Sequence, residues 1–177
     1  MNKLKNKNIK KILISLMFVF TIVCIVVFGT SNVFAATVLK SYNFSGSASA
    51  FGGKFQTFDY LEGRAADYVK VNIRANNGDN YDLRFVYTST FPSERKVLAE
   101  KKGITAKGSN NTFYFISKNG SCPGSSSQCI RVPVVDRIST ADNAVSFYDV
   151  MYGIEIYNGS FFGGTLNVSG TYSFMNY

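Results

Sequence analysis

The sequence predicts an all-β fold, and three observations carry that prediction. Apolar and polar residues alternate with a period of two over several short runs, as they do on strands with one buried face. The runs are separated by segments rich in Gly, Ser and Asn, which are typical of turns. Cys122 and Cys129 form an even set of cysteines after the N-terminal segment. We therefore expect a single antiparallel β-sandwich, a jelly roll or an immunoglobulin-like fold, of about eight or nine strands.

The N-terminus has the pattern of a secretory signal peptide. Residues 1–11 carry five lysines and no acid, residues 12–29 are apolar, and Val33-Phe34-Ala35 resembles a signal-peptidase site. We expect cleavage after Ala35, which divides the chain into a signal peptide (1–35) and a secreted domain (36–177). An uncleaved anchor is the alternative, because the apolar block reaches the ~18 residues needed to span a bilayer. The lysine-rich head and the frequent use of Lys, Asn and Ile indicate a bacterial protein, from a Gram-positive organism.

The secreted part is only weakly charged. The chain has 19 Lys and Arg and 11 Asp and Glu; removal of the five N-terminal lysines leaves 14 basic residues against 11 acidic ones, a net charge of +3. Nucleic-acid-binding proteins concentrate basic residues in one patch. The short basic runs Arg95-Lys96 and Lys101-Lys102 do not form one, so no nucleic-acid partner is expected.

The two cysteines of the secreted part are predicted to form a disulfide. They bracket the flexible segment Pro-Gly-Ser-Ser-Ser-Gln, and exported proteins meet an oxidising environment. A zinc site is not expected, because two thiols in a chain without histidine do not complete a zinc shell. No cofactor is expected either.

Two β-hairpins are the clearest local predictions. The first joins the alternating runs 69–75 and 81–87 through the Asn/Gly/Asp segment 76–80, and the second joins 150–156 to 166–174. The apolar run 112–116 predicts a strand covered on both faces. Further strands are expected at 38–44, 55–61 and 130–135, where Pro133 indicates an edge or a bulge. Ser93–Lys102 suits a helix or a strand, and a strand is favoured because neighbouring strands need a partner.

The sequence does not favour catalysis. The absence of histidine excludes Ser-His-Asp and Cys-His machinery. A glycosidase would need two carboxylates flanking a cleft. Asp59 and Glu62 are expected on opposite faces of a strand, and Glu155 at the surface.

Candidate binding residues gather at the second predicted hairpin. Phe161 and Phe162 lie in its glycine-flanked loop, and Tyr157 lies on the strand before it. Aromatic side chains at a loop tip can stack on a sugar, touch a membrane or contact a protein; the alternative is that they fold back over the end of the sandwich. Asp79, Asn80 and Asp82 offer oxygen ligands for calcium, but too few for a recognised calcium loop, so a plain turn is favoured.

Two segments carry a family resemblance. The stretch from Tyr68 through Asp82-Leu83-Arg84-Phe85, and Tyr152–Tyr157 followed by Gly170-Thr171-Tyr172, resemble the strand rhythm of bacterial pre-peptidase C-terminal-type sandwiches and of small secreted Gram-positive proteins. The resemblance covers about half of the secreted part and implies a non-catalytic sandwich that stands alone.

These observations favour a secreted, non-enzymatic β-sandwich that binds an extracellular partner, either an envelope glycan or a surface protein. A secreted toxin or antibacterial factor acting on membranes is the first alternative, and only this alternative involves membrane contact. A small hydrolase that uses carboxylates is the second alternative.

Overall fold

The computed structural model describes residues 36–59, 61, 65–89, 93–106, 108–135, 137–139, 150–160 and 164–177. The predicted signal peptide (1–35) lies outside the described residues. Residues Ala36–Tyr177 form one compact unit, which contains every strand described below. This unit therefore holds both sheets and the hydrophobic core that joins them.

The all-β prediction is confirmed, since the regular structure of the described residues consists of strands. Within these residues, no helix is long and apolar enough to cross a membrane. The strands are, in chain order, β1 (Thr37–Ala48), β2 (Lys54–Asp59), β3 (Ala65–Ala66), β4 (Tyr68–Asn76), β5 (Asn80–Ser89), β6 (Glu94–Thr105), β7 (Ser109–Ile116), β8 (Cys129–Arg131), β9 (Ile138–Ser139), β10 (Val150–Asn158) and β11 (Leu166–Asn176).

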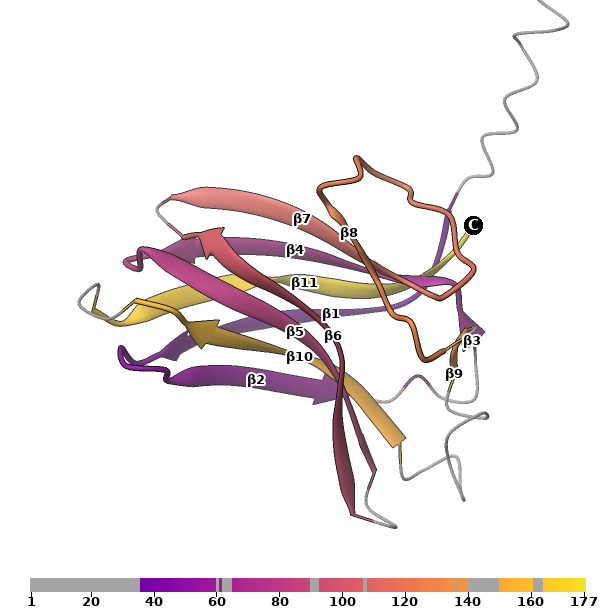
Figure 1. Ribbon diagram of the computed structural model, residues 1–177, viewed down its shortest axis with the longest axis horizontal. Coiled ribbons are helices and arrows are strands. Elements are labelled where there is room, and N and C mark those ends of the chain that lie inside the picture. The colour runs from indigo at the N-terminus through magenta and orange to yellow at the C-terminus, as the bar shows by residue number, and fades with distance from the viewer. Residues whose placement is uncertain are drawn as a thin grey trace, which may run out of the picture. The chain divides into compact units, whose positions relative to one another are not determined.

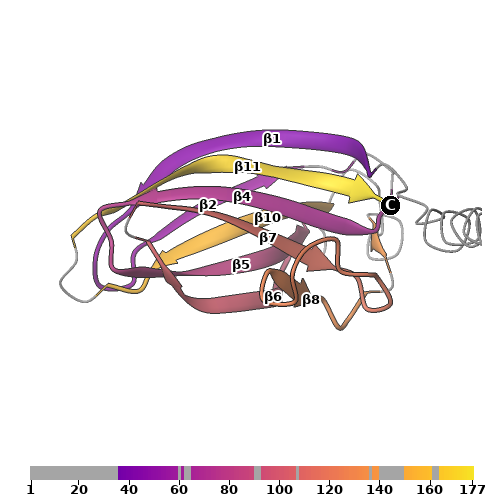
Figure 2. The ribbon, with the colours of Figure 1, turned by 90° about the horizontal axis from the view of Figure 1, so that it is seen from above.

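The long strands form two sheets that pack face to face (Figures 1 and 2). Sheet A has the order β1-β11-β4-β7-β8 and sheet B the order β2-β10-β5-β6, while β3 and β9 form a separate short pair. The chain passes from one sheet to the other between β1 and β2, β4 and β5, β6 and β7, and β10 and β11. Four strands ordered β1-β11-β4-β7 facing four ordered β2-β10-β5-β6 are the arrangement of a jelly roll. The sequence led us to expect either a jelly roll or an immunoglobulin-like fold, and the structure has the jelly roll.

Both predicted hairpins are wrong, although all four of their strands exist. β4 pairs with β11 and β7 in sheet A, whereas β5 pairs with β10 and β6 in sheet B. In the same way, β10 belongs to sheet B and β11 to sheet A. The segments between these strands are arches that cross the sandwich. Alternation shows which face of a strand is buried, but not which strand its backbone pairs with, so an arch and a hairpin have the same pattern.

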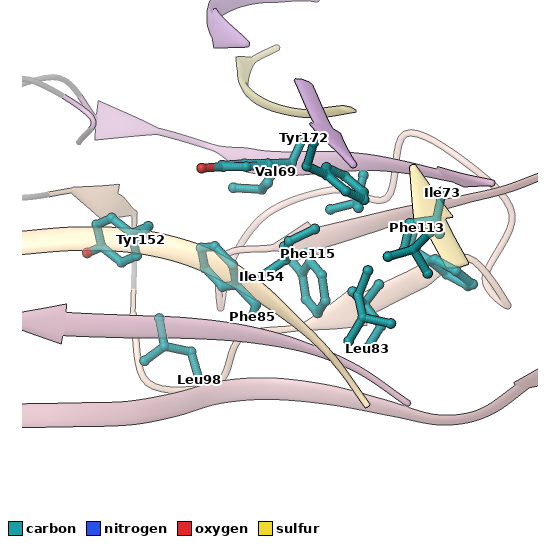
Figure 3. Packing of buried hydrophobic residues seen from close by; sticks show 14 of the residues in the cluster. Val69, Ile73, Leu83, Phe85, Leu98, Phe113, Phe115, Tyr152, Ile154 and Tyr172 are labelled. Atoms are coloured by element: carbon teal, nitrogen blue, oxygen red, sulfur yellow. The ribbon is translucent and has the colours of Figure 1, made fainter. Parts of the chain in front are cut away.

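The core lies between the sheets and is rich in aromatic rings. Phe85 of β5 is at its centre, with ring centroids 5.2 Å from Phe115 of β7 and 5.6 Å from Tyr152 of β10. Figure 3 shows these side chains between the two layers, together with Tyr172 of β11. Such offset or edge contacts add to the stabilisation from the buried area.

The predicted disulfide is confirmed, with Cys122 and Cys129 bonded and 5.9 Å between their Cα atoms. Cys129 begins β8, which pairs with β7 in parallel at the edge of sheet A. Cys129 also packs on a small apolar cluster separate from the main core, formed by Tyr68, Ile116 and Met175. The prediction that β7 is covered on both faces is therefore confirmed at its Ile116 end.

Two other segments discussed from the sequence form edge strands of the two sheets. Ser93–Lys102, for which a helix was the alternative, lies mostly in β6, the edge strand of sheet B. The predicted strand 130–135 is shorter than expected, because β8 ends at Arg131. Pro133 lies in the turn that follows, in agreement with its inability to donate a ladder hydrogen bond.

Candidate functional site

The candidate site lies at one end of the sandwich, which we call the loop end. Four connections meet there: 49–53 between β1 and β2, 77–79 between β4 and β5, 106–108 between β6 and β7, and 159–165 between β10 and β11, of which 107 and 161–163 lie outside the described residues. In Figure 1 the loop end is on the left. All the residues discussed next hold these connections together or line a depression among them.

Asn158, the last residue of β10, forms hydrogen bonds that join the connections of the loop end. It is buried, with 1% of its surface exposed. Its Nδ2 donates to the carbonyl oxygens of Ala48 (3.1 Å) and Gly164 (2.8 Å). Its Oδ1 accepts from the Ser160 N–H (3.0 Å), and its own N–H donates to the Gly53 carbonyl (2.9 Å). The side chain therefore satisfies backbone groups at the end of β1 and at both ends of the β10–β11 connection.

Ser160 is also buried, and its hydrogen bonds extend this network to the remaining connections. Its Oγ accepts from the Asp79 N–H (2.8 Å) and its carbonyl accepts from the Phe51 N–H (3.4 Å). The Asp79 carbonyl in turn accepts from the Ala106 N–H (3.1 Å). The loops at this end are thus fixed to one another by hydrogen bonds through Asn158 and Ser160.

Phe51 is the most exposed large apolar side chain among the described residues, with 72% of its surface exposed. Its backbone is left-handed, with a φ of +61°, and Gly52 follows with a φ of +81°. A left-handed non-glycine residue costs on the order of 1 kcal/mol. Strained backbone conformations of this kind cluster at functional sites, so this turn is a candidate binding feature.

Beside Phe51 lies a solvent-open depression of about 370 Å³. It combines aromatic rings with a carboxylate, a guanidinium and backbone polar groups. The described residues that line it are Phe51, Gly52, Asp82, Arg84, Tyr157, Asn158, Gly159 and Ser160.

The Arg84 and Tyr157 side chains of this lining hold each other in place. The guanidinium carbon of Arg84 lies 4.1 Å from the centroid of the Tyr157 ring, and its Nε donates to Glu100 of β6. Burial alone would lower the pKa of Arg84, but the hydrogen bond and charge of Glu100 raise it above its ordinary value. The Tyr157 hydroxyl donates to Glu155 (3.2 Å). Both side chains are therefore oriented by protein contacts before any ligand arrives.

The expectation that Glu155 lies at the surface is wrong. Its side chain is on the outer side of sheet B, as the alternation indicates, yet none of it is exposed. Arg95 forms a two-pronged ion pair with it, with Nε 2.9 Å from Oε1 and Nη2 contacting Oε2, and Lys54 lies 3.9 Å away. The hydrogen bond to Glu155 raises the pKa of Arg95 above its ordinary value. The long side chains of β2 and β6 thus close over the carboxylate.

The carboxylates considered for hydrolysis are not brought together. Asp59 is opposite Tyr152 in the β2–β10 register and shares its core-facing side, whereas Glu155 is on the outer side of the same sheet. Glu62 lies outside the described residues. Asp59 and Glu155 therefore do not flank one cleft, which is the geometry that carboxylate glycosidases need.

The three candidate calcium ligands lie near one another in the chain but have different surroundings. Asp79 is in the turn before β5, and Asn80 and Asp82 are on β5. The Oδ1 of Asp82 accepts a hydrogen bond from the Gly103 N–H (2.8 Å). In the part of the chain that the structure describes, no three His, Cys, Asp or Glu residues are close enough to hold a metal ion.

The predicted aromatic pair Phe161 and Phe162 lies outside the described residues, although Ser160 and Gly164 place the ends of its loop at the loop end. Tyr157, the third predicted residue, does line the depression. Sequence reasoning missed Phe51, Asp82 and Arg84 as its neighbours. A signal for Phe51 was present, because Phe51-Gly52-Gly53 repeats the Phe-Gly-Gly pattern of residues 162–164.

The chain matches no model of a protein family and no curated protein. A solved structure that it resembles is described as "Structure of infectious bursal disease virus Gt strain". The two chains are 12% identical with a TM-score of 0.37, and the match covers 80% of this chain and 32% of that chain. The chain thus spans about a third of the matched chain. A match this weak supports no conclusion about fold or function, and the jelly-roll assignment follows from the strand order alone.

Proposed function

We propose that this chain is an exported, non-enzymatic binding module that holds an extracellular glycan in the loop-end depression. The observation that carries the proposal is the depression itself, where the exposed ring of Phe51 lies beside polar groups that are already oriented. Sites for small ligands combine apolar and aromatic walls with a few placed polar groups, in volumes of about 300–1,000 Å³. The depression is within this range of volumes, and the Phe51 and Tyr157 rings of its lining stand beside the polar groups of Asp82 and Arg84.

A glycan fits this site better than a protein partner does. Stable protein interfaces bury roughly 800 Å² on each partner and usually have a broad apolar centre. Among the described residues of the loop end, Phe51 is instead an isolated exposed ring beside Gly52, Asp82 and Arg84. An aromatic face next to hydrogen-bonding groups suits a sugar ring, which has an apolar face and a rim of hydroxyl groups.

Export is supported by two independent features of the chain. Residues 1–35 have the order of basic, apolar and small residues that signal peptides share. The Cys122–Cys129 disulfide is typical of proteins that reach an oxidising compartment. The absence of histidine and the separation of Asp59 from Glu155 support a binding role over hydrolysis.

The test is co-sedimentation of residues 36–177 with insoluble envelope polysaccharide purified from a Gram-positive bacterium. We expect the wild type to bind and Phe51→Ala to bind at least tenfold more weakly. Val134→Ala is the matched control, because Val134 is 56% exposed and lines a different depression, with Tyr87 and Leu98. Equal binding by wild type and Phe51→Ala, or binding to lipid vesicles but not to polysaccharide, would overturn the proposal.

A further inference from the structure

We propose that the outer side of sheet A is a second binding surface, which holds an extended acidic polysaccharide. This surface is separate from the glycan site at the loop end and does not depend on Phe51, so the proposal goes beyond the proposed function. Three features carry it: the composition of this side, two cations on it that lack partners among the described residues, and a depression that crosses its strands.

Short polar side chains cover the outer side of sheet A. The residues of each strand alternate between the core and this side. On β1 the outward residues of 41–47 are Ser, Asn, Ser and Ser, and on β11 those of 167–173 are Asn, Ser, Thr and Ser. β4 and β7 continue the pattern with Asn72, Asn110 and Thr112. Serine, threonine and asparagine side chains donate and accept hydrogen bonds, as sugar hydroxyls do, so the surface suits a glycan.

The charged residues on this side are cations. No described strand of sheet A contains Asp or Glu, and the carboxylates of the described strands are all in sheet B. Lys70 and Arg74 of β4 point outward, and among the described residues neither side chain has an ion pair or a hydrogen bond. The carboxylate of Asp67, just before β4, is paired with Arg137, with 3.0 Å between Oδ1 and Nη2. An acidic ligand therefore meets unpaired cations here, without a carboxylate of the sheet to repel it.

A solvent-open depression of about 280 Å³ crosses β11, β4 and β7 on this side. Arg74 lines it, with Ser169 of β11 and Asn110 of β7 as its neighbours in the register. Arg74 is exposed, so its guanidinium is available to a carboxylate or phosphate group of a ligand. The depression thus places one cation between side chains that can bind hydroxyl groups.

The polar groups that line this depression orient one another. Thr112 Oγ1 donates to Asn72 Oδ1 (2.9 Å), and Asn72 Nδ2 donates to Thr171 Oγ1 (3.1 Å). These three residues form the row of the sheet next to Arg74. A ligand therefore meets side chains that are already held in place, which lowers the entropy lost on binding.

An extended polysaccharide fits this side better than a membrane or a protein does. Membrane and protein contacts use exposed apolar patches, whereas the outward residues of 41–47 and 167–173 are polar. Neighbouring strands lie about 4.8 Å apart and rise about 3.4 Å per residue. The four strands β1, β11, β4 and β7 therefore provide a surface about 14 Å wide and about 20 Å long. That area accommodates several linked sugar rings.

The test measures binding of residues 36–177 to two soluble polymers with one backbone, carboxymethyl dextran and uncharged dextran, by isothermal titration calorimetry at low salt. We expect the wild type to bind carboxymethyl dextran at least tenfold more tightly than dextran. Arg74→Glu should weaken binding of carboxymethyl dextran at least tenfold. Lys96→Glu is the matched control, because it makes the same change of charge at an exposed lysine of sheet B, and it should weaken binding less than threefold.

Three results would overturn the proposal. They are a wild type without preference for carboxymethyl dextran, equal losses in folded Arg74→Glu and Lys96→Glu, and tighter binding to polyglutamate, an acidic peptide, than to carboxymethyl dextran. Circular dichroism checks the fold of both variants. Arg74→Gln is a milder change that should still weaken binding at least threefold, and it replaces Arg74→Glu in the comparison if that variant does not fold.

Phe51→Ala separates this surface from the loop end, since it should change the affinity for carboxymethyl dextran less than twofold. A loss in Phe51→Ala without a loss in Arg74→Glu would assign the acidic polymer to the loop end, which would overturn this proposal and leave the proposed function standing. Salt separates the two surfaces in the co-sedimentation test as well, because it screens contacts with Lys70 and Arg74 but not the stacking of Phe51. Equal binding by wild type and Phe51→Ala in high salt would remove the proposed function and leave this surface in place.

Discussion

Glu155 is a fully buried carboxylate on the outer side of sheet B. The period-two pattern placed it on the correct side, because Ile154 and Ile156 point into the core. It did not indicate burial, since burial here depends on how far the side chains of Arg95 and Lys54 reach from neighbouring strands. Those strands are neighbours only in the folded chain, so the sequence around Glu155 carries no sign of them.

Replacing Glu155 by Gln should lower the free energy of unfolding by about 1–3 kcal/mol. Breaking a fully buried ion pair costs about 3–5 kcal/mol, but Arg95 is 43% exposed and recovers part of its hydration. Urea denaturation measures the change. Glu100→Gln, on the same side of sheet B, should cost no more than about 1 kcal/mol because its partners Arg84 and Lys102 are 26% and 69% exposed. Equal costs for the two variants would contradict the burial argument.

Removal of the hydroxyl group should have opposite effects on thermal stability at two core tyrosines. The Tyr172 hydroxyl is buried and has no hydrogen-bond partner of good geometry among the described residues, whereas the Tyr81 hydroxyl accepts from Asn111 Nδ2 (3.2 Å). An unsatisfied buried hydroxyl costs about 1–3 kcal/mol. Tyr172→Phe should therefore leave the Tm unchanged or raise it, and Tyr81→Phe should lower it by several degrees. Differential scanning calorimetry compares them, and a lower Tm for Tyr172→Phe would indicate a bonded hydroxyl.

At the scale of single elements, the sequence predicted most strands but not their partners. The runs 69–75 and 81–87 alternate as strands do, and they became β4 and β5. In a hairpin the two strands pair side by side, whereas in an arch they face each other across the core. Both arrangements bury one face of each strand, so alternation does not separate them. The choice depends on the backbone of β11 and β10, more than 60 residues further along the chain, and no local pattern contains that information.

The disulfide also acts on a single element, because it holds the short edge strand β8. The bond closes an eight-residue loop, and the chain-entropy model gives about 2.5 kcal/mol for it. Replacing both Cys122 and Cys129 by Ser should therefore lower the free energy of unfolding by up to about 2.5 kcal/mol without unfolding the domain.

Hydrogen exchange should locate the effect of that double replacement in β8 and the loop before it. Protection of Val132, whose N–H donates to the Ile116 carbonyl (2.8 Å), should fall. Protection in the central strands β4 and β11 should change only by the global loss of stability. Ser125→Ala in the same loop is the control with an intact bond. A uniform loss of protection across both sheets would show that the disulfide supports the whole fold.

At the scale of the whole molecule, the jelly roll brings together residues that no sequence window contains. Phe51, Asp82 and Tyr157 come from three connections or strands that the fold places at one end. The sequence predicted a sandwich because the patterns of its segments all indicated short strands separated by polar turns. It could not predict the depression, because that site exists only once β1, β5 and β10 are placed by the sheet order.

The whole molecule should also unfold at alkaline pH, because its core contains tyrosines. Burial raises the pKa of Tyr81 to about 12, although Asn111 opposes this, and burial raises the pKa of Tyr172 further. In the unfolded chain tyrosine ionises near pH 10. The folded state therefore holds more protons above about pH 10, so its stability is complete below that pH and falls as pH rises.

Each such tyrosine removes about 1.4 kcal/mol per pH unit in this window, or about 2.7 kcal/mol for the two together. Domains are usually stabilised by roughly 5–15 kcal/mol. A domain at the lower end of this range of stabilities should therefore unfold near pH 12, and a more stable one at a higher pH. Because the chain has 11 tyrosines and no tryptophan, tyrosinate absorbance can be followed cleanly beside circular dichroism. The exposed tyrosines should ionise first, and the last ones only together with the loss of the β-sheet signal. Ionisation of every tyrosine near pH 10 with both sheets intact would mean that Tyr81 and Tyr172 are in contact with solvent, which would contradict the packing of the core.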